Sequence, residues 1–310
     1  MNVSFPVNVT DFKPGSRWER LNGLNDQMFS WGDILRSAMV AGYRSSPYIP
    51  SPQFARWRGT TLQMALRRVD GQLIRPPEWD ELDPSEKGAI KSILGVVVTK
   101  LLVERLLNAP IFLFLDVHFR VFPPGGLRPD VLASTPRGEW FSVESKGHEW
   151  HTQRALAKGK KQAESIGTVN GRPVQTGVVC LTSFRGGLME AHLKDPPPDG
   201  EEPRDAKIDP KEVLRRYYSP LDWFRQVSEP LGEMDIPNSH LHARLWKSRE
   251  LDVKFGIHPK LEQALQGQSP EHAWEFLDHL ADHHTAQEDN FLGPDGIVVI
   301  PGESWKSEQV

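Results

Sequence analysis

The order of helical and extended segments between residues 84 and 184 constrains the fold of this chain more than any other feature. Asp83, Pro84 and Glu86 form a helix start, with an N-cap, a proline at the first helical position and a capping-box glutamate. Pro110 closes the pattern, so we expect one long helix from residue 84. Its apolar residues recur at helical spacing, at Ile90, Ile93, Val97 and Leu101.

Strand and helix patterns follow this helix in a definite order. Residues 111–122, 130–134 and 139–146 are rich in aromatic and branched residues or alternate in polarity, and turn residues separate them. Residues 151–166 suit a second helix, and residues 176–183 form an apolar strand. Helix, three strands, helix and strand in this order predict an α/β core with a mixed sheet.

The flanking regions have weaker patterns. Residues 1–83, which are basic and aromatic, predict short helices and loops, and residues 185–310 predict a mostly helical region. Residues 194–210 are proline-rich and acidic, which is typical of a disordered loop. A final strand at 296–300 is expected to return to the sheet. Further helices are expected at residues 211–227, 259–266 and 270–286.

Composition limits what the chain can do. Its 310 residues, 38% of them hydrophobic, are enough to bury a sizeable core. The only cysteine, Cys180, excludes an intramolecular disulfide and a multi-cysteine zinc site. The net charge of −4 implies that any contact with nucleic acid uses local basic patches. The lack of a signal-peptide pattern and of a long apolar segment predicts a cytoplasmic protein without membrane contact.

A short hairpin carries the residues that indicate chemistry. Side chains alternate between the two faces of a strand, so Glu144 and Lys146 point away from the face that carries Phe141 and Val143. Asp130 begins the preceding strand, and the hairpin would bring its side chain to the face of Glu144. Two carboxylates and an amine are therefore expected side by side.

Two neighbouring carboxylates are ligands that Mg²⁺ accepts, and Mn²⁺ would substitute for it. The Ser145 carbonyl, water and a substrate phosphate would complete the metal shell. A bound cation lowers the pKa of water and neutralises charge that grows on a phosphate. Lys146 would orient the attacking water, deprotonate it or stabilise the transition state, and the sequence leaves these three roles open.

Pro129-Asp130, followed after thirteen residues by Glu144-Ser145-Lys146, resembles the motif of the PD-(D/E)xK nuclease superfamily, which includes restriction endonucleases, repair nucleases and junction resolvases. The resemblance covers about residues 84–184 and implies a restriction-endonuclease-like core with helical additions at both ends. It also implies that Asp130 and Glu144 bind Mg²⁺ and that Lys146 is catalytic. Asp252-Val253-Lys254 spells the second half of the motif too, but it lacks an upstream Pro-Asp on a strand.

The resemblance also implies roles for two further residues, Glu104 and Gln162. Many members add an acidic residue from the first helix, which implies that Glu104 binds the metal. Alternatively, Glu104 lies at the surface and pairs with Arg105 or Lys100. Gln162 matches the glutamine of an exonuclease-like branch and would act in catalysis by steadying the phosphate or the water. Ile166 stands where that branch has a tyrosine, which argues against membership of the branch.

Basic residues in two segments are candidates for phosphate contacts. The set expected to bind nucleic acid is Arg56, Arg58, Arg154, Lys158 and Lys161. The predicted function is a magnesium-dependent nuclease that acts on DNA, in restriction, defence against phage or repair. The alternative is a non-catalytic nucleic-acid-binding or assembly subunit that retains the fold. A homo-oligomer, or a helicase or sensor partner subunit, is a further expectation.

Overall fold

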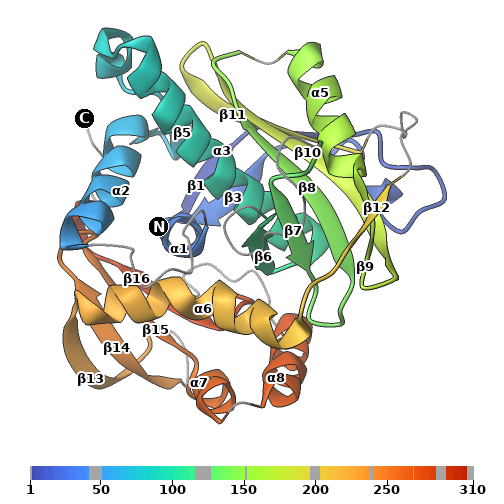
Figure 1. Cartoon of the computed structure of the whole chain (residues 1–310). Helices are drawn as coiled ribbons and strands as arrows, with labels where there is room; N and C mark the ends of the chain where they lie inside the picture. The colour runs from blue at the N-terminus through green and yellow to red at the C-terminus, as the bar shows by residue number, and fades with distance from the viewer. Residues whose placement is uncertain are drawn as a thin grey trace.

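The computed structural model describes residues 2–41, 51–115, 127–150, 152–195, 203–237, 241–267, 269–283 and 291–305, except for the side chains of residues 51–56, 58, 282 and 283. In these ranges the chain has a mixed α/β fold with two β-sheets (Figure 1). No helix in them combines the length and the apolar character that crossing a bilayer requires.

The larger sheet has 12 strands within the described ranges. These are β1 (Asn2–Phe5), β2 (Val7–Thr10), β3 (Gln27–Ser30), β4 (Arg67–Val69), β5 (Gln72–Ile74), β6 (Ile111–Phe114), β7 (Val131–Ser134), β8 (Trp140–Gly147), β9 (Ile166–Val169), β10 (Arg172–Arg185), β11 (Leu188–Lys194) and β12 (Arg204–Ala206). The main path runs β3-β1-β5-β11-β10-β8-β7-β6, and β2, β4, β9 and β12 pair beside it.

The second sheet has four strands in sequential order, and helices surround both sheets. Its strands are β13 (Glu229–Asp235), β14 (His242–Ser248), β15 (Val253–Ile257) and β16 (Ile297–Pro301). The helices are α1 (Trp31–Val40), α2 (Ser51–Ala65), α3 (Pro84–Leu107), α5 (Gln153–Glu164), α6 (Pro210–Gln226), α7 (Pro259–Gln266) and α8 (Pro270–His283). In Figure 1, α3 and α5 lie against the larger sheet, while α7 and α8 lie beside the second.

Helix α3 begins and ends where its sequence signals predict. The Asp83 side chain accepts hydrogen bonds from the backbone N–H groups of Ser85 and Glu86, and the Glu86 side chain accepts one from the Asp83 N–H. This capping box satisfies donors that the first helical turn leaves without partners. Asn108 ends the helix in the left-handed conformation (φ 53°), which asparagine tolerates well.

The central strands follow the predicted order, with β9 added before β10. Strands β6, β7 and β8 are antiparallel neighbours, and β10 lies parallel to β8 on its other side. Val131 of β7 lies opposite Val143 of β8, so the residues just beyond this pair, Asp130 and Glu144, meet where β7 begins. This register places the two carboxylates of the sequence motif next to each other.

Helices α3 and α5 cover opposite faces of β8. The Thr99 hydroxyl of α3 donates to the Ser145 hydroxyl at 3.0 Å, whereas the side chain of Lys146, the next residue, contacts Gln162 of α5. Since neighbouring residues of a strand point to opposite faces, the two helices sandwich the strand. The predicted division of β8 into an apolar face and a face with Glu144 and Lys146 is therefore correct.

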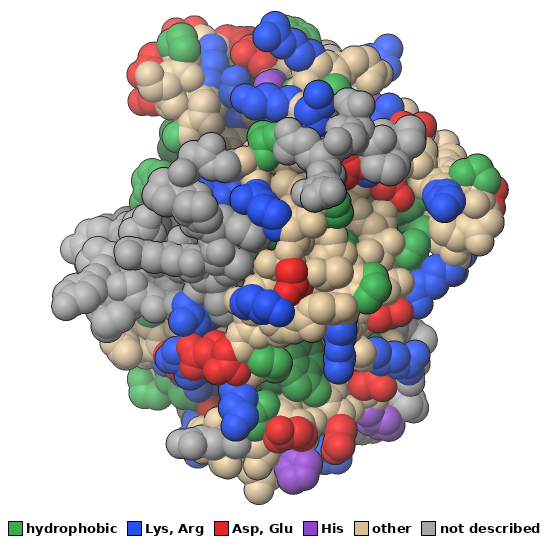
Figure 2. All heavy atoms as spheres, turned by 45° about the vertical axis from the view of Figure 1, so that its right-hand side comes forward, with side chains coloured by type: hydrophobic (Ala, Val, Ile, Leu, Met, Phe, Trp, Pro, Cys, Tyr) green, Lys and Arg blue, Asp and Glu red, His purple; other side chains and the backbone are tan. Residues whose placement is uncertain are grey.

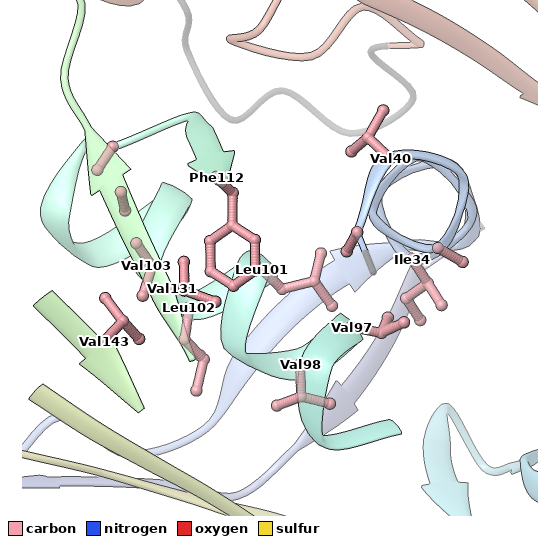
Figure 3. Close-up of a cluster of buried hydrophobic side chains, with 14 of the residues drawn as sticks. Ile34, Val40, Val97, Val98, Leu101, Leu102, Val103, Phe112, Val131 and Val143 are labelled. Atoms are coloured by element: carbon pink, nitrogen blue, oxygen red, sulfur yellow. The ribbon is translucent and has the colours of Figure 1, made fainter. Parts of the chain in front are cut away.

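The main core lies between α1, α3 and the central strands. Figure 3 shows Ile34 and Val40 of α1, Phe112 of β6, Val131 of β7 and Val143 of β8 around a row of labelled α3 side chains. All of these side chains are buried. Burial of each aliphatic or aromatic side chain of this kind stabilises the fold by about 1.5–3 kcal/mol. This packing fixes the strands that carry Asp130 and Glu144.

The prediction of a helical N-terminal region is only partly correct. Helices α1 and α2 are present, but the region also contributes five short strands to the larger sheet, β1 to β5. β1 pairs with β3 and β2 pairs with β11, so this segment extends the sheet. Each of these strands has only three or four residues, which is too short for a clear alternation of polar and apolar positions.

The C-terminal region differs from the prediction in the same way. Helices α6, α7 and α8 lie where they were expected, but strands β13, β14 and β15, which lie between α6 and α7, were not predicted. The final strand exists as β16 and pairs with β15 of the second sheet, so it does not return to the larger one. Within the expected loop 194–210, residues 196–202 lie outside the described residues, and β12 occupies Arg204–Ala206.

Candidate functional site

Two reciprocal hydrogen bonds join Asp130 to β8. The Asp130 backbone N–H donates to Glu144 Oε2 at 2.9 Å, and the Ser145 N–H donates to Asp130 Oδ2 at 3.1 Å. Each carboxylate is thus held by the backbone of the opposite strand. Because Val131 and Val143 form the last pair of the β7–β8 ladder, these bonds extend the hairpin by one residue on each strand.

Lys146 and Gln162 complete the group. The Lys146 ammonium forms an ion pair with Glu144 Oε1 and donates to Gln162 Oε1 at 3.1 Å. Gln162 Nε2 in turn donates to the Arg128 carbonyl at 3.3 Å, just before Asp130 in the chain. Asp130, Glu144, Lys146 and Gln162 therefore form one hydrogen-bonded set, which we call the β8 cluster.

Close packing of α5 on the sheet places Gln162. A Cβ added to Gly159 would lie 2.9 Å from Val179 Cγ2 and 3.3 Å from Glu144 Cγ, so only glycine allows this approach. Thr152 caps the helix, its hydroxyl accepting the Ala155 N–H at 3.1 Å. The helix therefore has a fixed start and a fixed distance from Glu144.

The Glu144 carboxyl lies in an unusual electrostatic environment. Its side chain is fully buried, and burial together with the negative charge of Asp130 raises its pKa to about 8, against the opposing effect of Lys146. When no cation is bound, burial and the charge of Asp130 therefore favour the protonated carboxyl, and Lys146 favours the ionised one. A cation at the same position would compensate the two negative charges and favour the ionised form.

The oxygen atoms of the β8 cluster are of the kind that hard cations prefer. Besides Asp130 and Glu144, the Ser145 carbonyl faces this position, because the N–H and C=O of a residue in a strand point to the same edge and the Ser145 N–H donates to Asp130. Among the described residues, no group of three or more His, Cys, Asp or Glu side chains that could hold a metal is present. Magnesium usually takes one or two protein carboxylates and keeps water or phosphate in its other positions, so the donor set fits it.

Helix α3 supports the opposite side of β8 at very close range. A Cβ added to Gly147 would lie 1.8 Å from the Lys91 carbonyl oxygen, and one added to Gly95 would lie 2.8 Å from the Gly147 nitrogen. The backbones of helix and strand are in direct contact at these two glycines. The strand that carries Glu144 and Lys146 is therefore held between α3 and α5.

Glu104 lies in a different charge network. Both of its carboxylate oxygens accept hydrogen bonds from Arg36, at 2.6 and 2.8 Å, and one also pairs with Lys100. Arg36 also pairs with Asp295 at 3.0 Å. Although burial opposes ionisation, Arg36 and Lys100 lower the pKa of Glu104 to about 2. Its oxygens are thus engaged by cations of the protein, and its partners come from α1 and α3 rather than from the β8 cluster.

The second motif-like triplet is part of a turn in the smaller sheet. Asp252 adopts a left-handed conformation (φ 47°), and its carboxylate accepts the Ser304 N–H at 2.9 Å and the Ser304 hydroxyl at 2.7 Å. Lys254 lies in β15, where it pairs with Lys247 of β14 and Ile300 of β16. Asp252 therefore has a structural partner in the segment that follows β16.

The predicted nucleic-acid residues fall on two helices. Arg154, Lys158 and Lys161 are exposed on α5, the helix that also carries Gln162. Arg56 and Arg58 lie on α2, but their side chains lie outside the described residues. Figure 2 shows lysine and arginine side chains gathered in the upper part of the view, at the height where Figure 1 draws α5.

Sequence reasoning missed several residues that shape the site. Thr99, Gly147 and Gly159 hold β8 between its two helices, and the Arg128 carbonyl accepts the hydrogen bond from Gln162. No motif marks these positions, because each acts through the closeness of segments far apart in the sequence. No family model matches the chain, and no match was found among curated proteins or solved structures.

Proposed function

We propose that the chain is a magnesium-dependent nuclease that hydrolyses phosphodiester bonds in DNA, with the β8 cluster as its active site. The observation that carries this proposal is the joining of Asp130, Glu144, Lys146 and Gln162 by direct hydrogen bonds at the start of β7. Two neighbouring carboxylates can hold a metal ion that activates water, and an amine at the same place can stabilise the charge of a phosphate.

The proposed roles follow from the contacts of each residue. Asp130, Glu144 and the Ser145 carbonyl would hold Mg²⁺, with Mn²⁺ as a substitute, and the bound cation would supply a water of lowered pKa and neutralise charge on the phosphate. Lys146 lies between Glu144 and Gln162, from where it would orient the attacking water or stabilise the transition state. Gln162 would hold Lys146 in place and contact the phosphate.

The surroundings of the cluster support a nucleic-acid substrate. Arg154, Lys158 and Lys161 recur at helical spacing on the exposed face of α5, and Lys161 adjoins Gln162 of the cluster. Cations in such a row would bind successive phosphates and position the strand. The central order of α3, three strands, α5 and β10 supports a restriction-endonuclease-like core as part of the same proposal.

Cleavage assays with matched variants test the proposal. The purified protein is incubated with supercoiled, linear duplex and single-stranded DNA, in Mg²⁺ or in a chelator. We expect Mg²⁺-dependent cleavage, and we expect Asp130→Ala, Glu144→Ala and Lys146→Ala each to reduce it by about 10²-fold or more, as for loss of an electrostatic stabiliser. Lys254→Ala removes the lysine of the second triplet and should leave cleavage unchanged.

Two outcomes contradict this assignment. Full activity in all three cluster variants would remove the β8 cluster from the reaction. DNA binding without Mg²⁺ binding, measured by titration calorimetry, would instead favour the non-catalytic nucleic-acid-binding or assembly subunit. Cleavage that appears only when a helicase or sensor subunit is added would keep the site and assign the chain to a larger complex.

A further inference from the structure

Trp150 is the most exposed large hydrophobic side chain in the described part of the chain. Its exposed fraction is 63%, and it lies in the connection between β8 and α5. Single exposed apolar side chains are common at protein surfaces, so the exposure by itself has no functional meaning. The position of this tryptophan relative to the β8 cluster is what gives it significance.

The backbone that leads into Trp150 is held by hydrogen bonds to β10. The His148 N–H donates to the Thr182 carbonyl at 2.8 Å, and the Phe184 N–H donates to the Glu149 carbonyl at 3.4 Å, so residues 148 and 149 continue alongside β10. The Glu149 carboxylate also pairs with Lys91 of α3 at 3.5 Å. The exposed indole therefore extends from an anchored segment, and little conformational entropy would be lost when it binds a flat partner.

Trp150 lies between the two parts of the proposed substrate path. It follows Lys146 by four residues, which is at most about 13 Å along an extended chain. Two residues after it, Thr152 caps α5, whose exposed cations begin at Arg154. Trp150 and these cations are therefore close in the sequence, and an exposed ring together with cations is the combination that binds single-stranded nucleic acid, with bases stacked on the ring and phosphates on the cations.

We infer that Trp150 stacks on an unpaired base of a DNA strand whose phosphates follow α5 towards the β8 cluster. This inference rests on the proposed nuclease function and narrows its substrate class to DNA with unpaired bases, such as single strands, overhangs or flaps. In the interior of a paired duplex each base face is already covered by its neighbours, so the indole finds a free face only at the two ends.

Binding measurements without cleavage test this inference. Fluorescence anisotropy of a labelled oligonucleotide in a chelator gives the affinity of Trp150→Ala, Trp150→Phe and Met28→Ala, the last removing another exposed hydrophobic side chain, on β3. We expect Trp150→Ala to weaken single-strand binding about 5- to 150-fold, the range for one lost base–aromatic stack, while Trp150→Phe keeps most of the affinity. The affinity of Met28→Ala for the single strand, and the affinity of Trp150→Ala for a long blunt duplex, should change by less than about twofold.

A probe in the DNA makes the stacking visible. The fluorescence of 2-aminopurine is quenched when this base stacks on an aromatic ring. When the probe is placed at successive positions of the oligonucleotide, the natural chain should quench its fluorescence at one of them, and Trp150→Ala should not. Equal losses on single strands and blunt duplex, or an unchanged affinity of Trp150→Ala, would overturn the inference. Neither measurement depends on cleavage. If the natural chain cleaves no DNA but Trp150→Ala still weakens single-strand binding, the nuclease function is refuted and the role of Trp150 in binding is not.

Discussion

Glu144 links the proposed metal site to proton binding. Its pKa of about 8 in the folded protein exceeds the ordinary value of 4.5, which an unfolded chain would show. Between these two values the folded state holds a proton that the unfolded state has released. The free energy of unfolding therefore falls as the pH rises through this window, by up to about 1.4 kcal/mol per pH unit.

Glu144→Gln should remove this dependence, because the amide does not titrate. In a chelator, we expect the natural chain to lose more stability than Glu144→Gln between pH 5 and pH 8, as measured by urea unfolding. At pH 8, Mg²⁺ should raise the free energy of unfolding of the natural chain more than that of Glu144→Gln, since the variant has lost one carboxylate of the proposed metal site. If the free energy of unfolding depended on pH in the same way in the two chains, the raised pKa of Glu144 would be contradicted.

The approach of α3 to β8 depends on glycine at one strand position. A Cβ at Gly147 would meet the Lys91 carbonyl at 1.8 Å, so Gly147→Ala must push the helix away from the strand. We expect a loss of about 1–3 kcal/mol in the free energy of unfolding, the usual cost of overpacking. Gly88→Ala is the matched control, because Gly88 lies on the exposed start of α3 with no atom near its added Cβ.

Thermal and urea unfolding separate the two glycine variants. Gly88→Ala should be stabilised by up to about 1 kcal/mol, since alanine favours a helix. Gly147→Ala should also lose cleavage in the fraction that remains folded, because the strand that carries Glu144 and Lys146 moves. A neutral effect of Gly147→Ala would show that α3 and β8 have room between them.

Local signals account for the elements that could be predicted from the sequence. Asp83 and Glu86 predicted the start of α3, and the alternation of residues 139–146 predicted β8 and its two faces. β1 to β5 are too short for such signals and form only through partners far along the chain, as when Val7 pairs with Ala191. The β8 cluster could be predicted because Asp130 and Glu144 belong to one hairpin, whereas the pairing of Arg36 with Glu104 joins segments 68 residues apart.

A buried ionic network connects distant parts of the chain. Arg36 of α1, Glu104 and Lys100 of α3 and Asp295 before β16 pair with one another, and the Tyr217 hydroxyl of α6 donates to Asp295 at 2.6 Å. All five side chains are buried. Removing one charge from such a network leaves its partner without compensation, at a cost of about 3–5 kcal/mol.

Glu104→Gln tests both this network and the metal role implied for Glu104. The pKa of Glu104 is about 2 when folded and 4.5 ordinarily, so its ionisation stabilises the fold above pH 4.5, and this contribution is lost as the pH falls towards 2. The stability difference between the natural chain and Glu104→Gln should therefore be smaller at pH 3.5 than at pH 7. Mg²⁺ affinity should stay within about twofold, because a ligand loss would cost far more.

If Glu104→Gln lost as much Mg²⁺ affinity as Glu144→Gln, Glu104 would have to be counted as a ligand of the metal. An unchanged stability at pH 7 would show that the network contributes nothing to the fold. Either result is read from the same two titrations, one with urea and one with Mg²⁺.

The place of Asp295 in this network affects how the protein is made. Arg36 and Lys100 leave the ribosome long before residue 295, and until then they have one fewer carboxylate among their partners. A nascent chain can therefore complete this charged network only after residue 295 has been synthesised. Early portions of the chain would have to keep these cations hydrated, or shielded by a chaperone, while synthesis continues.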